Sequence, residues 1–178
     1  MRAFVLGLAL MSTSLVALAQ TTAHAFSADG WRTLRWPMSL DEARAALATA
    51  HVTFTSEDRT GMFPRAGSGF AEVSFTTLRA READREIAVE YENHHLTEVR
   101  VIVRRASRAA AEQELSRLRL QWGEPSAHAT VAGVASGTEY TWSNATTRLV
   151  LHVVRVPSST DWFATEVWSP ATPWPSWR

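Results

Sequence analysis

The pattern of apolar and polar positions predicts two amphipathic helices. The first begins at Ser39, whose hydroxyl can accept the backbone N–H of Glu42 while the Glu42 carboxylate accepts the backbone N–H of Ser39, an arrangement called a capping box. Apolar and polar residues start to alternate at Val52, so we expect this helix to end near residues 50–51. Its buried stripe, at helical spacing, would consist of Leu40, Ala43, Leu47 and Ala50.

The second predicted helix spans residues 108–122. Ser107 precedes it as a candidate cap, and Gly123 and Pro125 follow it. Glycine readily adopts the left-handed conformation that ends a helix, and proline cannot continue one, so this order marks a helix end. The apolar stripe of this helix consists of Ala111, Leu115, Leu118 and Trp122.

Between the two helices, period-2 alternation predicts about four strands. We expect the first over residues 51–57 and the second over residues 71–77. The segment 60–69 is rich in glycine and proline and is expected to be a loop, and the charged run 79–85 is expected to be a solvated turn.

The clearest predicted hairpin joins residues 87–91 to residues 99–103. Two registers keep its apolar side chains on one face. One register places Glu90 opposite Glu98, and the other places Glu90 opposite Arg100. Opposite charges across a strand pair stabilise by ~0.2–1 kcal/mol and like charges destabilise. We therefore predict the register that pairs Glu90 with Arg100.

After the second helix, a polar stretch containing glycine is expected to be irregular. Residues 138–142 and 147–153 then alternate and predict a hairpin with a two-residue turn, which places Trp142 opposite Thr147. A last strand is expected over residues 162–168.

This order of elements predicts an α+β fold in which two helices pack on antiparallel sheet. A helix followed by strands occurs twice, which predicts two tandem modules over residues 26–106 and 107–168. A tail rich in proline and tryptophan follows over residues 169–178.

Two features resemble those of small periplasmic proteins: the Trp-Pro-Met-Ser-Leu-Asp-Glu segment of residues 36–42, and a helix–Gly-x-Pro order followed by a tryptophan-bearing hairpin. The chain resembles the tandem αβ modules of β-lactamase-inhibitor-like proteins and the related outer-membrane-assembly lipoprotein modules, over about residues 36–168. The resemblance implies helix-plus-antiparallel-meander modules and an inhibitor-like role. The chain has no cysteine, so neither a lipid-anchor cysteine nor the disulfides typical of the inhibitors can form.

Composition excludes several kinds of chemistry. Among 178 residues there are 18 basic and 18 acidic side chains, so no excess positive charge favours nucleic acid or an anionic membrane surface. The lack of cysteine excludes thiol nucleophiles and cysteine-ligated metals. All the basic residues are arginine, which excludes lysine Schiff bases.

Residues 1–25 are expected to be a secretory signal peptide. Arg2 precedes an apolar run, and Ala23-His24-Ala25 fits a cleavage site, so we expect cleavage after Ala25. An alternative site follows Ala19, and an uncleaved membrane anchor is the alternative reading. Because the run is shorter than the ~20 residues of a spanning helix, we expect export to the periplasm or beyond, with no stable membrane insertion after cleavage.

The candidate catalytic groups are sparse. His94 and His95 are adjacent and would point to opposite sides of an extended chain, so they are expected to lie in a solvated turn and to hold no metal. The residue types of a catalytic triad occur at His51, Asp58 and Ser68. We do not expect them to form one, because no nucleophile-elbow motif surrounds the serine. The acidic run around Glu82, Asp84 and Glu86 is interleaved with arginines and is expected to be self-neutralising. We expect no catalytic residue and no cofactor.

The outer face of the sheet is the strongest candidate for a binding site. If Tyr140, Trp142, Leu149 and Leu151 pack inward, four other residues point outward: Ile102, Val150, His152 and Val154. We predict that the tail, with Trp174 and Trp177, folds back on the domain over this face, and the alternative is that a protein or peptide partner binds it. We therefore expect an exported, non-enzymatic binding or inhibitor-like protein. A small secreted hydrolase and a structural envelope component remain the alternatives.

Overall fold

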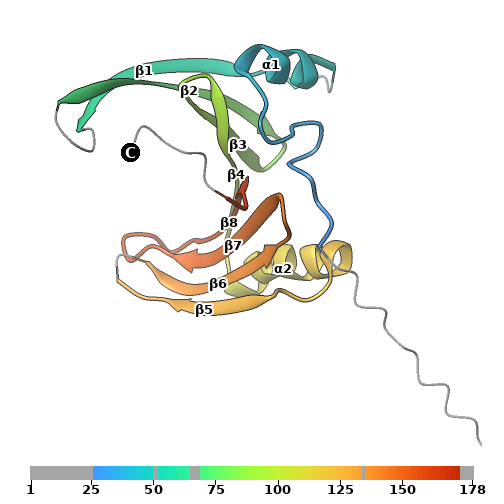
Figure 1. Ribbon diagram of the computed structural model, residues 1–178. Coiled ribbons are helices and arrows are strands. Elements are labelled where there is room, and N and C mark those ends of the chain that lie inside the picture. The colour runs from blue at the N-terminus through green and yellow to red at the C-terminus, as the bar shows by residue number, and fades with distance from the viewer. Residues whose placement is uncertain (1–25, 50–51, 65–68, 134, 173–178) are drawn as a thin grey trace, which may run out of the picture.

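The computed structural model of the chain describes residues 26–49, 52–64, 69–133 and 135–172 (Figure 1). The predicted signal peptide, with its predicted cleavage site at Ala25, and the tail tryptophans Trp174 and Trp177 lie outside the described residues. In chain order the elements are α1 (Leu40–Thr49), β1 (Thr55–Pro64), β2 (Phe70–Glu82), β3 (Arg85–Glu92), β4 (His95–Arg105), α2 (Arg108–Trp122), β5 (Ala127–Val131), β6 (Ser136–Ser143), β7 (Thr147–Arg155) and β8 (Trp162–Pro170).

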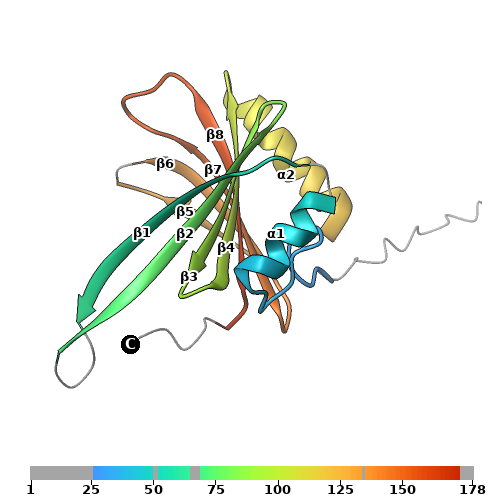
Figure 2. The same ribbon diagram turned by 90° about the horizontal axis from the view of Figure 1, so that it is seen from above.

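The eight strands form one antiparallel sheet, in the order β1-β2-β3-β4-β8-β7-β6-β5. Strands β1 to β4 make one meander, strands β5 to β8 make the second, and β4 pairs with β8 where the two runs meet. The two helices pack on this sheet, and Figure 2 shows both on the same side of it. The predicted α+β class is confirmed.

Both helices begin where their caps predict. Before α1, the backbone N–H of Ser39 donates to the Glu42 carboxylate at 2.8 Å, and the backbone N–H of Glu42 donates back to the Ser39 hydroxyl at 3.3 Å. Leu40, Ala43 and Leu47 are buried under α1. The capping box is therefore formed, and it sets the start of the helix.

Helix α2 has the predicted bounds. The Ser107 hydroxyl accepts the backbone N–H of Ala110, and Gly123 adopts a φ of 76° while its N–H bonds to the Arg119 carbonyl at 2.9 Å. Leu118 is fully buried, and the indole N–H of Trp142 donates to the Gly123 carbonyl at 2.9 Å. The end of α2 is thus tied to β6, because one side chain of the sheet caps its last turn.

The first hairpin is longer than the sequence pattern predicts. Residues 58–64 continue β1 along β2, although the sequence predicts a loop from residue 60. The glycine that suggests a turn lies inside the strand: a Cβ on Gly61 would come within 2.6 Å of the Phe63 ring. The Phe63 ring in turn packs edge-on against Phe75 at 5.5 Å. Gly61 therefore leaves space for the Phe63 ring within the strand. A prediction from glycine propensity alone places a turn at this residue instead.

The predicted register of the β3–β4 hairpin is wrong. Glu90 lies opposite Glu98, and Ala88, not Glu90, lies opposite Arg100. The turn decides this register, because Asn93 and His94 both adopt positive φ values, of 50° and 66°, and close a tight two-residue turn. A shift in register between Glu90 and the next residue then lets the two strands continue.

The β6–β7 hairpin is also shifted relative to the prediction. Trp142 lies opposite Leu149, not Thr147. The turn is shifted by one residue, because the backbone N–H of Asn144 donates to the Thr147 carbonyl at 3.0 Å and leaves Ala145 and Thr146 between them. Asn144 Oδ1 fixes this turn by accepting the backbone N–H groups of Thr146 and Thr147 at 2.8 Å each. Residues 127–131, predicted to be irregular, form strand β5 at the sheet edge.

Strand β2 also runs through most of the charged run that was predicted to be a turn at 79–85. Strand β2 continues to Glu82, and the turn is confined to residues 83–84, with Ala83 at a φ of 51°. Strand β8 runs to Pro170 and takes up the start of the predicted tail. No helix in the part of the chain that the structure describes is long and apolar enough to cross a membrane.

Candidate functional site: the concave face of the sheet

The two faces of the sheet differ in what covers them. Both helices and the segment before α1 lie on one side, and in Figure 1 the sheet curls away from them. Strands β1 and β2 form one arm of the curve, and β5 and β6 form the other. We call the inner, helix-free side the concave face.

The structure brings four predicted binding residues onto this face. Val150, His152 and Val154 are alternate residues of β7, and they lie opposite β8 residues that share their side of the sheet. Ile102 of β4 lies opposite Thr165 of β8, which also pairs with His152. Val150 is only 6% exposed, while the other three are half-buried.

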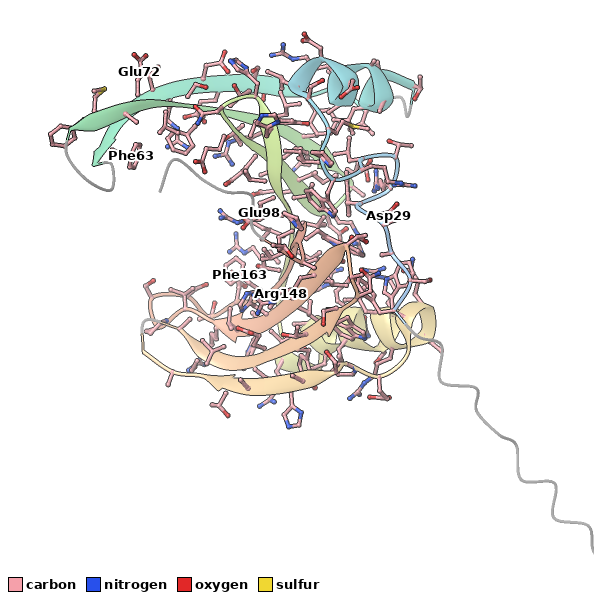
Figure 3. All side chains as sticks on the ribbon, in the orientation of Figure 1. Asp29, Phe63, Glu72, Glu98, Arg148 and Phe163 are labelled. Carbon is pink, nitrogen blue, oxygen red and sulfur yellow. The ribbon has the colours of Figure 1, made fainter. Side chains whose placement is uncertain are left out.

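The sequence reasoning missed two residues of the same patch. Phe163 lies opposite Val154, and Val167 lies opposite Val150, so both share the concave face. Figure 3 shows Phe163 inside the curve. The alternation of apolar residues over 162–168 indicates that Phe163 and Val167 share one side of their strand. Only the pairing of β8 with β7 shows that this side is the concave face. We define the apolar patch as Ile102, Val150, Val154, Phe163 and Val167.

Polar side chains border the apolar patch on β6 and β7. Glu139 lies opposite His152, with the Glu139 carboxylate 3.7 Å from Nδ1 of His152 and 3.9 Å from the Arg148 guanidinium. Arg104, on the other side, forms an ion pair with Asp161. Charges of both signs therefore surround an apolar centre, which is the usual anatomy of a protein-binding surface.

A charged cluster lies where β3 and β4 face the interior of the curve. Arg100 contacts both Glu90, at 3.3 Å, and Glu98. Burial raises the pKa of Glu98 above its ordinary 4.5, and the charge of Arg100 opposes that rise. Glu98 is labelled within the curve in Figure 3. This cluster adjoins the apolar patch, because Arg100 lies opposite Val167.

That arm carries apolar residues on both sides. Phe63 and Phe75 pack edge-to-face on the concave side, and Val73, two residues before Phe75 on β2, is fully buried. On the opposite side, Met62 and Phe70 are 62% and 68% exposed. These two side chains therefore meet solvent at the end of the β1–β2 hairpin.

The candidate catalytic groups do not assemble. His51 and Ser68 lie outside the described residues, and Asp58 accepts a hydrogen bond from the Thr76 hydroxyl at 2.7 Å. His94 lies in the exposed β3–β4 turn. Within the described ranges, no three His, Asp or Glu side chains gather as a metal site.

The acidic run is paired, as its interleaved arginines predict, but two of its partners come from elsewhere in the chain. Glu86 pairs with Arg81 at 2.8 Å, whereas Glu82 pairs with Arg32, and Asp84 with Arg105, at 2.5 Å each. These carboxylates are therefore engaged in ion pairs on the surface.

Comparison of this chain with protein-family models, curated proteins and solved structures finds no match.

Proposed function

We propose that this chain is an exported, non-enzymatic binding protein that holds a protein or peptide partner on the concave face of its sheet. One observation carries the proposal: five apolar side chains, the cross-strand pairs Val150–Val167 and Val154–Phe163 together with Ile102, lie on the side of the sheet opposite the described helices. An open sheet face is normally polar, because its side chains meet water. An apolar patch there costs solubility unless it serves a contact.

The chemistry of the surrounding residues favours a protein partner. Arg104, Arg148 and Glu139 border the patch with both signs of charge, whereas a nucleic-acid surface would carry a basic stripe. The curve of the sheet offers a concave surface to a protruding loop or segment (Figure 1). An inhibitor-like role agrees with this shape, and it is also what the resemblance to the tandem αβ inhibitor modules implies.

Export is the second part of the proposal. Phe26 is the first described residue, and its ring centre lies 5.4 Å from that of Trp122 and 6.2 Å from that of Trp168. A mature chain that starts at Phe26 would therefore keep the packing that the described residues show. The intact mass of protein recovered from the periplasm or medium would test this, because retention of Met1 would contradict cleavage after Ala25.

The binding experiment compares two charge substitutions in the mature chain. Phe163→Glu places a charge in the apolar patch, and Leu120→Glu places the same charge on the outer side of α2, where Leu120 is 86% exposed. A partner captured from envelope extract and then purified should bind Phe163→Glu at least ~10-fold more weakly, a loss of about 1.4 kcal/mol. Leu120→Glu should bind like the unchanged protein.

Circular dichroism and urea unfolding establish that both variants are folded. Equal affinity of the two variants for the partner would contradict use of the concave face. Turnover of a substrate by the purified protein would contradict the non-enzymatic assignment.

A further inference from the structure

A pocket of about 480 Å³ lies on the other side of the sheet, away from the concave face. Its walls come from the segment before α1, from α2, and from the helix-facing side chains of β3, β4 and β8. This volume falls within the range that holds a small molecule. The pocket belongs to none of the surfaces described above.

The apolar part of the wall is made of indole rings. Trp31 and Trp168 are each 5% exposed, and Trp122 is half-buried. Trp122 and Trp168 pack edge-to-face with ring centres 6.3 Å apart, so their positions are fixed. Rigid indoles offer a flat apolar wall to a ring or an aliphatic chain.

Two buried carboxylates beside the pocket are already neutralised. The side chains of Glu114 and Glu166 are 7% and 4% exposed. Arg85 donates to Glu114 at 2.8 Å and to Glu166 at 3.4 Å, and Arg117 donates to Glu114 at 2.9 Å and also contacts Glu166. The Trp168 indole N–H also donates to Glu166, at 3.0 Å. Neither carboxylate is left to attract a cation.

Arg35 differs from the other arginines of the lining. Its guanidinium donates to the backbone carbonyls of Arg32, at 2.6 Å, and Leu34, at 3.0 Å. No ion pair with a carboxylate of the described chain neutralises it, whereas Arg32 pairs with Glu82. Backbone carbonyls therefore hold a positive charge in place at the pocket, which is the arrangement that favours an anion.

We propose that this pocket binds a small organic carboxylate, with its carboxylate on Arg35 and its apolar body against the indoles. The lining holds four guanidinium groups, from Arg32, Arg35, Arg85 and Arg117, against the two carboxylates of Asp29 and Glu166. Glu166 is covered by its arginines, so Asp29 is the carboxylate that opposes a bound anion. Arg35 is exposed, so a ligand carboxylate can reach its guanidinium from solvent.

The probe is benzoate, which combines a carboxylate with an apolar ring, and its binding is followed by tryptophan fluorescence and calorimetry. We expect saturable binding with a dissociation constant of about 1 mM or tighter. Benzyl alcohol has the same ring without the charge, and inorganic phosphate has charge without the ring. Each should bind at least ~5-fold more weakly than benzoate, a difference of about 1 kcal/mol.

Two pocket variants should shift the affinity in opposite directions. Arg35→Gln removes the anion partner and should weaken benzoate binding at least ~5-fold. Asp29→Asn removes the opposing charge and should tighten binding about twofold. Arg119→Gln is the matched control, because it removes an α2 arginine that pairs with Glu124 and does not line the pocket.

Several results would overturn the proposal. One is the absence of saturable binding up to about 20 mM benzoate, well above millimolar dissociation constants. Others are equal binding of benzyl alcohol, tighter binding of phosphate, an unchanged affinity in Arg35→Gln, or weaker binding in Asp29→Asn. The concave-face variant Phe163→Glu should bind benzoate normally, so failure of this proposal and failure of the partner-binding proposal can be told apart.

Discussion

Glu90 and Glu98 lie directly opposite each other on neighbouring strands of the concave face. Like charges in this position destabilise a sheet. Arg100 follows Glu98 by two residues, so it projects from the same face, and its guanidinium contacts both carboxylates. The attraction that the sequence suggests between Glu90 and Arg100 is therefore kept, but it acts diagonally across the strands.

Replacing Arg100 tests this diagonal contact. Arg100→Gln leaves two carboxylates facing each other, and we expect a loss of about 0.5–1 kcal/mol of unfolding free energy, the scale of partly exposed ion pairs. Adding Glu90→Gln should recover most of the loss, since it removes the repulsion. Urea unfolding of the single and double variants measures both effects. Arg79→Gln, which breaks a 3.5 Å pair with Glu57, is the control.

Glu98 predicts a definite dependence of stability on pH. Burial raises its pKa above the unfolded value of 4.5, so the fold favours the neutral form. The stability that the neutral Glu98 side chain contributes is fully present below its unfolded pKa, and it is lost as the pH rises through its folded pKa. Glu98→Gln should therefore be more stable than the unchanged protein at about pH 7, and this advantage should shrink towards about pH 4. An advantage that grows on acidification would contradict the sign.

Glu42 provides the opposite case for the same unfolding experiments. Its hydrogen bond with the Ser39 backbone lowers its pKa below the ordinary 4.5. Its stabilisation is therefore present above that value and is lost as the pH falls through the folded pKa. Glu42→Gln should destabilise at neutral pH and become harmless in acid.

The core contribution of α2 is tested by two leucines of the same helix. Leu118 is fully buried and Leu120 is 86% exposed. Leu118→Ala should cost roughly 2–5 kcal/mol, because it removes apolar contacts and leaves a cavity. Leu120→Ala should change stability by less than about 0.5 kcal/mol. Urea unfolding measures both variants, and the comparison is valid if their m-values are equal. Similar losses of unfolding free energy in the two variants would contradict the packing of α2.

The prediction that the tail docks on the domain concerns residues outside the described chain. Burial of the two tail indoles is worth about 2–3 kcal/mol each, and ordering the backbone costs about 1–2 kcal/mol per residue, so the two contributions are close in size. Deleting residues 173–178 should lower the melting temperature by about 2–4 °C, which corresponds to about 1 kcal/mol in a chain of this size. An unchanged melting temperature, together with solvent-exposed emission from Trp174 and Trp177, would contradict docking.

Local signals determined the two helices and the fold class. The bounds of α2 follow from Ser107 and Gly123, and the start of α1 from Ser39 and Glu42. These residues act within one turn of the backbone, so their hydrogen bonds need no partner from elsewhere in the chain. Alternation of apolar residues likewise put Val150 and Val154 on one side of a strand, because the pleat fixes that relation within the strand.

Only the tertiary structure decided how the strands meet. The register of β3 and β4 follows from the positive φ values at the turn and not from charge pairing. Phe163 belongs to the apolar patch because β8 lies between β4 and β7 in the sheet. No local sequence pattern predicts this strand order. The pocket depends on Arg35, Arg117 and Trp168, which are far apart in the sequence. Interactions between distant segments depend on the whole packing arrangement, whereas a capping bond or a pleat is complete within a few residues.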